Sequence, residues 1–468
     1  MSPAPVAASP AAAPTRASGA PRGAGATLAV TSAATTVALM NYTVPMLTLP
    51  DLTADFGTAI SAQAWLLNGA PLGLAALLLV AGSLADDYGR RRLFLAGTLG
   101  LALTTGLGAL AGSTLTFTLA RIAQGASSAA IIASSLGLLV HAFPPGPGRI
   151  RATGVWGAFV SAGIAAGPLL AGGLGTYGWR LPYVALAVAA LVIAVPAFRT
   201  LGESRAPRGG RPDLAGAVVL SLVMTALLSA LTLGRDGWLR APVMLLLVAA
   251  AVLTGVFAAV ERRGDAPLID PRLVGRRPFQ AATSGALFMG LAVIGLFSYL
   301  PALLQRTLGI SPMGAAWLFV LWSGTAFVVA LQARRLAGRV AARHQLALGF
   351  ALHAAGALSM LGAVGAGSWE RLVPGLLVAG VGCGLLNAAL PRLSVESVPQ
   401  ERAAMGAGAN NTARYIGSAA GVALMIAVAT SADTPEHGTD LAILVSAGVT
   451  ALGAALVLAL RDTTAARN

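Results

Sequence analysis

Gly82-Ser83-Leu84-Ala85-Asp86-Asp87-Tyr88-Gly89-Arg90-Arg91-Arg92 separates two apolar runs, each of which is long enough to cross a bilayer. Arginine is costly in hydrocarbon and is enriched in the cytoplasmic loops of membrane proteins. The segment therefore predicts a short cytoplasmic turn between two transmembrane helices.

The composition indicates the same class of protein. Hydrophobic residues make up 56% of the 468 residues and charged residues only 10%, with a mean hydropathy of +0.77. A soluble globular domain carries about a quarter charged residues. The chain is therefore predicted to be an all-α polytopic membrane protein.

The net charge of +14 is the difference between 31 basic and 17 acidic residues; all 31 basic residues are arginine, and most lie in the short breaks between apolar runs. Orientation in the membrane and contact with anionic lipid headgroups explain this pattern, so we expect membrane lipids and no nucleic acid as partners. The single cysteine, Cys383, lies inside an apolar run and excludes a disulfide within the chain.

A crossing takes about 20 apolar residues, and the sequence predicts fourteen of them. They are 27–48, 63–84, 93–112, 117–141, 152–174, 182–199, 214–234, 241–260, 279–303, 314–333, 345–366, 371–393, 403–430 and 440–460. With a cytoplasmic N-terminus, 24 arginines fall on the inner side and five on the outer side. This bias predicts that both termini are cytoplasmic.

Two arginines remain, Arg121 and Arg414, and both lie within predicted spans. A charge at that depth is expensive and commonly faces the protein interior or a watery cavity. Snorkelling of the side chain to the interface is the alternative, more plausible for Arg121 than for Arg414. We expect Arg121 near Asn41 and Gln124, and Arg414 near Asn410, with both arginines facing a cavity.

The opening loop resembles the signature loop of the major facilitator superfamily, although Asp87 replaces the usual basic residue. Four further segments resemble the fourteen-span drug:proton antiporters of that superfamily. The resemblance implies two six-helix bundles, 27–200 and 279–461. It also implies a linker with two additional helices at 201–278, and cytoplasmic tails at 1–26 and 462–468. It marks Gly82, Asp86, Gly89, Arg90 and Arg91 as candidate gating residues, with Asp86 and the arginines forming a cytoplasmic latch.

Two of these segments lie in the fourth and fifth spans. Arg121, Gln124 and Ser128 share one helix face and resemble the family motif R-x-x-q-G. The glycines and proline of the fifth span resemble the antiporter motif typical of exporters; they are Gly163, Gly167, Pro168 and Gly172. The alternative for the fifth span is a packing kink without a role in transport direction.

The other two segments lie in the ninth and tenth spans, from Tyr299 to Pro312, and in the thirteenth span. In the thirteenth span Asn410, Asn411, Arg414 and Ser418 form a polar stripe. Such a stripe either lines a cavity or holds helices together by hydrogen bonds. The glycine pairs of the fifth and thirteenth spans also form a weak internal repeat, as expected of two related halves.

The family pattern breaks in the first span, where Asn41 replaces an acidic residue. Asparagine does not titrate, and no Asp or Glu lies at a predicted mid-membrane depth. We therefore list His353 with the cavity and coupling candidates, although a packing role for it is equally open.

Catalytic, metal and phosphate-binding patterns are absent from the sequence, so neither an enzyme activity nor a cofactor is expected. The resemblance implies secondary active efflux of amphipathic small molecules such as antibiotics, drugs or natural products. Export would occur by alternating access in exchange for protons, with a monomeric protein in the cytoplasmic membrane. The alternatives are uptake or metabolite transport within the same superfamily and a non-transporting membrane enzyme or sensor.

Overall fold

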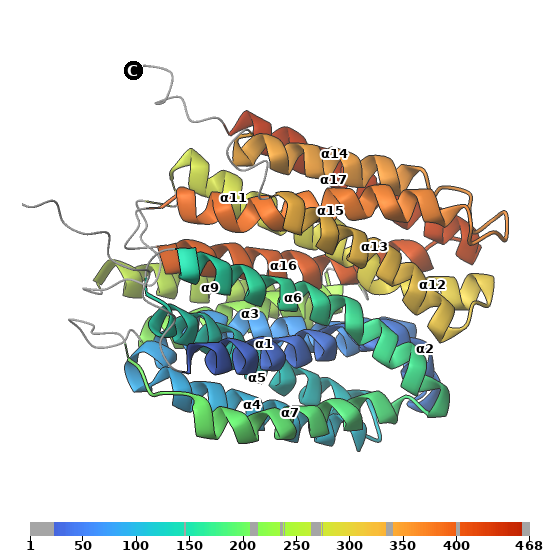
Figure 1. Ribbon diagram of the computed structural model, residues 1–468. Helices are drawn as coiled ribbons and strands as arrows, with labels where there is room; N and C mark the ends of the chain where they lie inside the picture. The colour runs from blue at the N-terminus through green and yellow to red at the C-terminus, as the bar shows by residue number, and fades with distance from the viewer. Residues whose placement is uncertain are drawn as a thin grey trace, which may run out of the picture.

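A computed structural model describes residues 23–144, 147–205, 214–234, 237, 239–263, 273, 275–333, 340–398 and 403–460. Every regular element in these ranges is a helix (Figure 1). The α-helices are α1 (Ala24–Thr43), α2 (Pro45–Asp55), α3 (Gln63–Tyr88), α4 (Arg90–Ala109), α5 (Thr114–Ala142), α6 (Pro147–Leu174), α7 (Arg180–Thr200), α8 (Leu214–Leu233), α9 (Ala241–Arg263), α11 (Arg277–Phe288), α12 (Gly295–Leu308), α13 (Pro312–Ala333), α14 (Ala342–Leu358), α15 (Leu372–Glu396), α16 (Ala403–Thr430) and α17 (Pro435–Ala459). A π-helical segment, η4 (Met289–Ile294), joins α11 to α12.

Within the described residues, ten helices are long and apolar enough to cross a membrane. Together with the all-helical architecture, this confirms the prediction of a multi-pass membrane protein. Each of the fourteen predicted ranges overlaps a helix. The number of crossings beyond these ten stays a prediction.

Some predicted boundaries differ from the structure. The first span is divided at Val44 into α1 and α2, with Pro45 opening the second helix, where a missing N–H is tolerated. Helix α14 ends at Leu358, before the predicted limit of 366, and turns containing Gly362 (φ 70°) and Gly367 (φ 63°) follow. At the N-terminus α1 begins at Ala24, inside the predicted tail 1–26, while residues 1–22 and 461–468 lie outside the described part.

The helices pack in two sets that run along each other (Figure 1). In the first set α1 packs against α5, α6 and α7, while α3 and α4 pack against α5. In the second set α15 packs against α13 and α14, and α16 packs against α11 and η4. The sets meet where α6 packs along α13 and α3 packs along α16.

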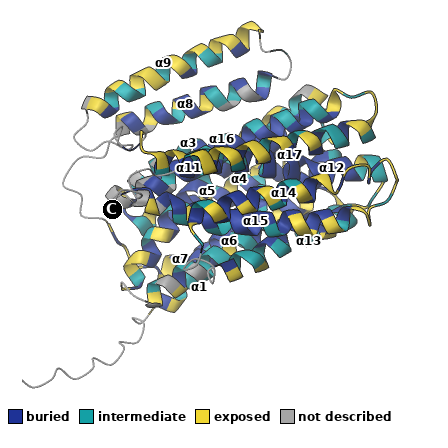
Figure 2. Cartoon of the chain, turned by 90° about the horizontal axis from the view of Figure 1, so that it is seen from above, coloured by how far each residue is buried: buried dark blue, intermediate teal, exposed yellow. Residues whose placement is uncertain are grey.

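Helices α8 and α9 form a pair beside these sets (Figure 2). Helix α8 packs on α3 and α16, and its Ser221 hydroxyl donates to the Ala76 carbonyl of α3 at 2.6 Å. Helix α9 packs against α8 and is mostly exposed. An apolar exposed face of this kind is suited to contact with lipid.

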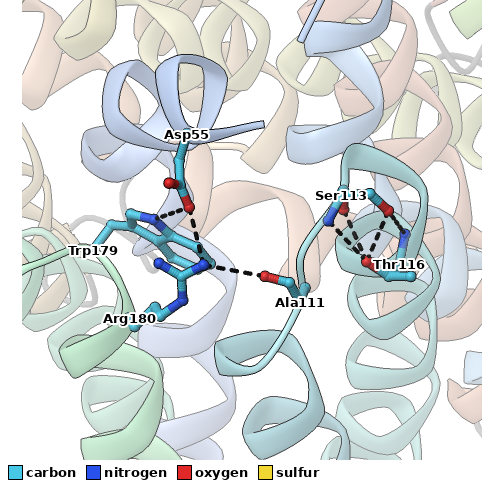
Figure 3. A network of polar contacts seen from close by, with 6 residues as sticks. All are labelled: Asp55, Ala111, Ser113, Thr116, Trp179 and Arg180. Atoms are coloured by element: carbon cyan, nitrogen blue, oxygen red, sulfur yellow. Dashed lines mark hydrogen bonds and ion pairs between the residues drawn. The ribbon is translucent and has the colours of Figure 1, made fainter. Parts of the chain in front are cut away.

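Polar and aromatic contacts fix one end of the first set. Asp55 binds Arg180 at 3.0 Å and accepts from Trp179 Nε1 at 3.1 Å, and Arg180 also donates to the Ala111 carbonyl at 3.4 Å (Figure 3). Beside them, Ser113 and Thr116 cap α5 reciprocally. The network joins α2, the α4–α5 connection and the start of α7, so we expect these elements to move as one body.

Candidate functional site

An open cavity lies between the two helix sets, with about 640 Å³ of empty space that includes the solvent at its mouth. Its wall takes residues from α1, α2, α6, η4, α12, α13, α15 and α16. They are Tyr42, Thr43, Met46, Ser161, Ile164, Met289, Ile294, Phe297, Ser298, Phe319, Trp322, Ser323, Ala326, Phe327, Cys383, Asn387 and Arg414.

Aromatic rings form one side of the cavity wall. The rings of Phe297 on α12 and Trp322 on α13 are stacked, with centroids 4.1 Å apart and an interplanar angle of 12°. Phe319 meets Trp322 edge-on at 5.2 Å. No motif or spacing distinguishes these residues from the other apolar residues of their spans, so the sequence did not predict them.

Arg414 is the charged residue of the described cavity wall. Its Nη2 donates to Asn411 Oδ1 at 2.8 Å, and its guanidinium lies 5.2 Å from the ring centroid of Tyr415. Arg414 was expected near Asn410, but its hydrogen bond is to the next residue, Asn411, while Asn410 is buried and donates to the Ala282 carbonyl of α11 at 3.0 Å. Within the polar stripe, Asn410 therefore holds α16 against α11, while Arg414 lines the cavity.

Arg121 is completely buried in the first set and is held by uncharged acceptors. Its Nη1 donates to the Asn41 carbonyl at 2.7 Å, to Asn41 Oδ1 at 2.6 Å and to Gln124 Oε1 at 2.7 Å. Asn41 in turn donates to Thr105 Oγ1, and Gln124 donates to the Thr104 carbonyl. The expected contact with Asn41 and Gln124 is present. The expectation that Arg121 faces the cavity is wrong, because these groups enclose it.

Tyr42 connects the Arg121 site with the second set. Its carbonyl accepts from Arg121 Nη2 at 3.3 Å, and its hydroxyl lies 3.0 Å from the Ser418 hydroxyl on α16. Its ring meets Tyr415 at a centroid distance of 6.4 Å. One residue of α1 thus contacts the buried arginine, the cavity and the opposite helix set. The sequence offered no spacing signal for this contact between distant helices.

His353 on α14 lies outside the cavity wall. It is fully buried and packs against Phe297 at a centroid distance of 5.6 Å, with Phe297 between it and the cavity. Of the two roles given for this candidate, lining the cavity does not fit its position, and coupling stays a prediction. Position 353 faces inward toward α15, where Gly382 approaches the backbone of His353 closely.

The glycines of the fifth span serve two different contacts. A side chain at Gly163 or Gly167 would collide with α1. At Gly163 the nearest atom to an added Cβ is the Thr36 carbonyl oxygen, at 2.6 Å; at Gly167 it is the Thr43 hydroxyl, followed by the Met40 carbonyl oxygen at 2.7 Å. At Gly172 it would meet Met313 and Ala316 of α13, in the other set. Pro168 is buried within α6.

The corresponding glycines of α16 repeat the first of these contacts. Gly417 and Gly421 lie against the backbone of Leu287 and Leu291, in the first span of the second set. The weak repeat in the sequence is thus matched by equivalent packing in both sets, and small residues allow this close approach of helices.

The arginine loop is organised by a carboxylate that the sequence analysis did not single out. Glu203, just after α7, accepts from the Arg91 backbone N–H at 3.1 Å and lies 3.6 Å from Arg92 Nε. Gly89 has φ 121°, and a Cβ there would lie 2.6 Å from the Glu203 carboxylate. A glycine is therefore required both by the backbone conformation and by the carboxylate.

The remaining loop residues contact neighbouring helices. Arg90 donates to the Gly137 carbonyl of α5 at 3.1 Å, and Arg91 donates to the Phe198 carbonyl of α7 at 2.6 Å. Gly82 faces open space, and the Asp86 side chain lies outside the described part of the chain. We call the end of the molecule that contains this loop the arginine end.

Comparison with known proteins identifies the architecture. The model of the Major Facilitator Superfamily matches residues 31–422 and 282–468. The chain belongs to the major facilitator superfamily. Among solved structures, a peptide transporter in complex with sulfate has a TM-score of 0.71 at 16% identity and covers 94% of both chains. The human organic anion transporter MFSD10 has a TM-score of 0.66 at 17% identity, covering 93% of this chain and 99% of its own. These two show the fold alone.

Curated relatives of this superfamily member are more similar in sequence. The probable actinorhodin transporter of Streptomyces coelicolor is 34% identical over 86% of this chain and 71% of its own length. The puromycin resistance protein pur8 of Streptomyces alboniger is 34% identical, covering 90% and 86%. The cephamycin export protein CmcT of Amycolatopsis lactamdurans is 33% identical, covering 89% and 87%.

Proposed function

We propose that this superfamily member exports amphipathic small molecules, such as an antibiotic or another natural product, from the cytoplasm across the cell membrane. The observation that carries the proposal is the cavity between the two helix sets, whose wall combines aromatic and aliphatic side chains with one cation and a few hydroxyl and amide groups. Such a wall suits cargo that is largely apolar with few polar groups. Relatives whose names describe export or resistance support the same direction of transport.

The proposal includes an orientation and a division of the chain. We place the arginine end and both termini in the cytoplasm, because arginine is favoured on that side. Residues 27–200 and 279–461 would act as two six-helix bundles, with the additional pair from 201–278 outside them, in a monomeric protein of fourteen spans. The packing of α8 and α9 beside the two sets supports this division.

Alternating access would then require the two sets to separate at one end at a time. At the end opposite the arginine end, Gln305 on α12 donates to the Leu47 carbonyl at 3.2 Å. Arg306 donates to Thr53 Oγ1 at 3.2 Å and to Gln63 Oε1 at 3.4 Å. These contacts between α12 and the first set would break when cargo is released outside, and the α6–α13 contact at Gly172 would loosen with them.

We propose protons as the coupling ion, as the resemblance to drug:proton antiporters implies. The described cavity wall carries no carboxyl or imidazole group, so the proton-binding group would lie elsewhere. His353 is a candidate, because it contacts the wall residue Phe297 from behind. His353→Gln should then leave the binding of cargo intact, while transport into vesicles should no longer depend on an imposed pH gradient. Unchanged coupling would exclude His353.

The proposed function is tested in an efflux-deficient bacterial host. Cells that express the chain should tolerate higher concentrations of some antibiotics or dyes than cells with the empty vector. The control is Arg121→Ala at a matched amount of membrane-inserted protein. Equal susceptibility of all three strains across a broad compound panel would contradict export of amphipathic compounds.

A further inference from the structure

The cavity wall holds hydrogen-bond donors that have no acceptor in the described part of the protein. Trp322 is 6% exposed, and its indole Nε1 has no acceptor there. Arg414 gives one hydrogen bond through Nη2, to Asn411, while its Nε is without one. Buried donors without acceptors are costly and rare. Two such donors on one wall point to a ligand that brings acceptor oxygens.

The charge of the wall selects the sign of that ligand. Arg414 is the charged side chain of the described wall, and no Asp or Glu accompanies it there. Its other polar members are neutral, among them Asn387, whose amide makes only a weak contact with Cys383 Sγ at 3.5 Å. Coulomb interactions are strong in a medium of low dielectric constant. The wall therefore favours an anion and disfavours an ammonium group.

The aromatic side of the same wall selects the shape of the ligand. The stacked pair of Phe297 and Trp322, with Phe319 against its edge, forms a rigid group of rings. Planar aromatic ligands gain from offset stacking or edge-on contact with such rings. A flexible aliphatic chain of equal area would be stabilised by burial of its apolar surface but not by stacking on these rings.

We propose that the cavity contains a subsite for an aromatic anion, a planar ring system that carries a carboxylate or phenolate oxygen. Arg414 binds the oxygen by charge-assisted hydrogen bonds, Trp322 Nε1 donates a further one, and the ring lies along Phe297, Trp322 and Phe319. The inference deepens the proposed function, since it rests on the cavity being the cargo site. The wall predicts that cationic compounds are poorer cargo than anions of the same ring system.

Equilibrium binding to the purified full-length protein in lipid nanodiscs tests the subsite without requiring transport. The probes are anthracene-2-carboxylate, the neutral anthracene-2-carboxamide and the cationic 2-(aminomethyl)anthracene. We expect the carboxylate to bind about tenfold or more tightly than the cation, the size of one charge-assisted contact. Arg414→Gln should abolish this preference. The matched control Arg371→Gln, at an exposed loop position, should retain it.

A second variant keeps the test decisive if Arg414→Gln does not fold. Trp322→Phe preserves a ring and the charge of Arg414 but removes the indole donor. It should weaken binding of the carboxylate probe severalfold and leave binding of the cationic probe unchanged. Binding of the cation as tight as that of the carboxylate, or an unchanged preference in Arg414→Gln, overturns the subsite. Export without binding of the carboxylate overturns the subsite and leaves the proposed function standing. Binding of the carboxylate without export of any compound would overturn the proposed function and leave the subsite standing.

Discussion

Arg121 Nη1 lies 2.6 Å from Asn41 Oδ1, so a buried guanidinium of α5 is paired with a neutral amide of α1. Three further acceptors, from Asn41, Gln124 and Tyr42, complete the site. The guanidinium is thus held inside the first helix set by uncharged acceptors. Because Tyr42 contacts both Arg121 and Ser418 of α16, we expect a movement of α1 relative to α16 to change the hydrogen bonds of Arg121.

Replacement of Asn41 tests the role of this amide. Asn41→Leu removes one side-chain acceptor from a buried charge, and a hydrogen bond to a charged group contributes about 1.5–3 kcal/mol. We expect a clear loss of thermal stability in detergent and of membrane-inserted protein. Asn41→Asp keeps an acceptor and adds an opposite charge, so it should be as stable as the natural chain or more so. Equal stability of all three proteins would contradict this account of Arg121.

The hydrogen bond between Tyr42 and Ser418 joins the two helix sets and should bias the conformational equilibrium. Tyr42→Phe and Ser418→Ala each remove it, and a neutral hydrogen bond contributes about 0.5–1.5 kcal/mol. The two changes should therefore shift the equilibrium equally, and the double variant should add nothing more. Distances between spin labels at the exposed positions Thr176 and Ser311, in a Cys383→Ser background, report the shift. Additive effects would mean that the two hydroxyls act independently.

The glycines of α6 predict two separable defects. Gly167→Val crowds the Met40 carbonyl within the first set, at a cost of about 1–3 kcal/mol for overpacking. It should lower stability and the amount of folded protein. Gly172→Val crowds Met313 and Ala316 across the interface, so the fold should persist while the spin-label distance between Thr176 and Ser311 increases and transport falls. Identical phenotypes would show that the two contacts are not distinct.

The Glu203 carboxylate should stabilise the arginine loop. Glu203→Ala removes the acceptor of the Arg91 N–H at the start of α4 and the ion pair with Arg92. Because Arg92 is mostly exposed, we expect Glu203→Ala to lower the free energy of unfolding by only about 1 kcal/mol, chiefly through the lost helix cap. Gly89→Ala should cost at least as much, since it meets both an unfavourable φ and the carboxylate. Urea titration of tryptophan fluorescence in detergent would detect both losses, and undiminished stability of Gly89→Ala would contradict the geometry.

Asp86 remains the proposed member of a cytoplasmic latch. Charge reversal in Asp86→Lys should leave the protein inserted but idle, because the carboxylate would no longer attract the neighbouring arginines. The measurement is transport by vesicles that contain matched amounts of the two proteins. Full transport by Asp86→Lys would exclude the latch.

The helical architecture could be predicted from the sequence because bilayer-length apolar runs and arginine-rich breaks are local signals. The partners of Arg121 were predictable as well, since Asn41 and Gln124 are the polar side chains that the resemblance puts at the same depth. Contacts between distant segments were not. Glu203 reaches Arg91 from a position 112 residues away, and Tyr42 meets Ser418 across 376 residues. The sequence could not tell which asparagine Arg414 binds, because Asn410 and Asn411 lie four and three residues before it and both positions are its neighbours on the helix surface.

The central claim, outward transport through the cavity, is tested most directly in everted membrane vesicles, whose cytoplasmic face points outward. Vesicles that contain the natural chain should accumulate a compound identified by the susceptibility panel when a proton gradient is imposed, and collapse of the gradient should stop the accumulation. Vesicles with Phe297→Ala and Trp322→Ala together should accumulate far less at equal protein content. Accumulation in right-side-out vesicles instead, or undiminished accumulation by the double variant, would contradict the account.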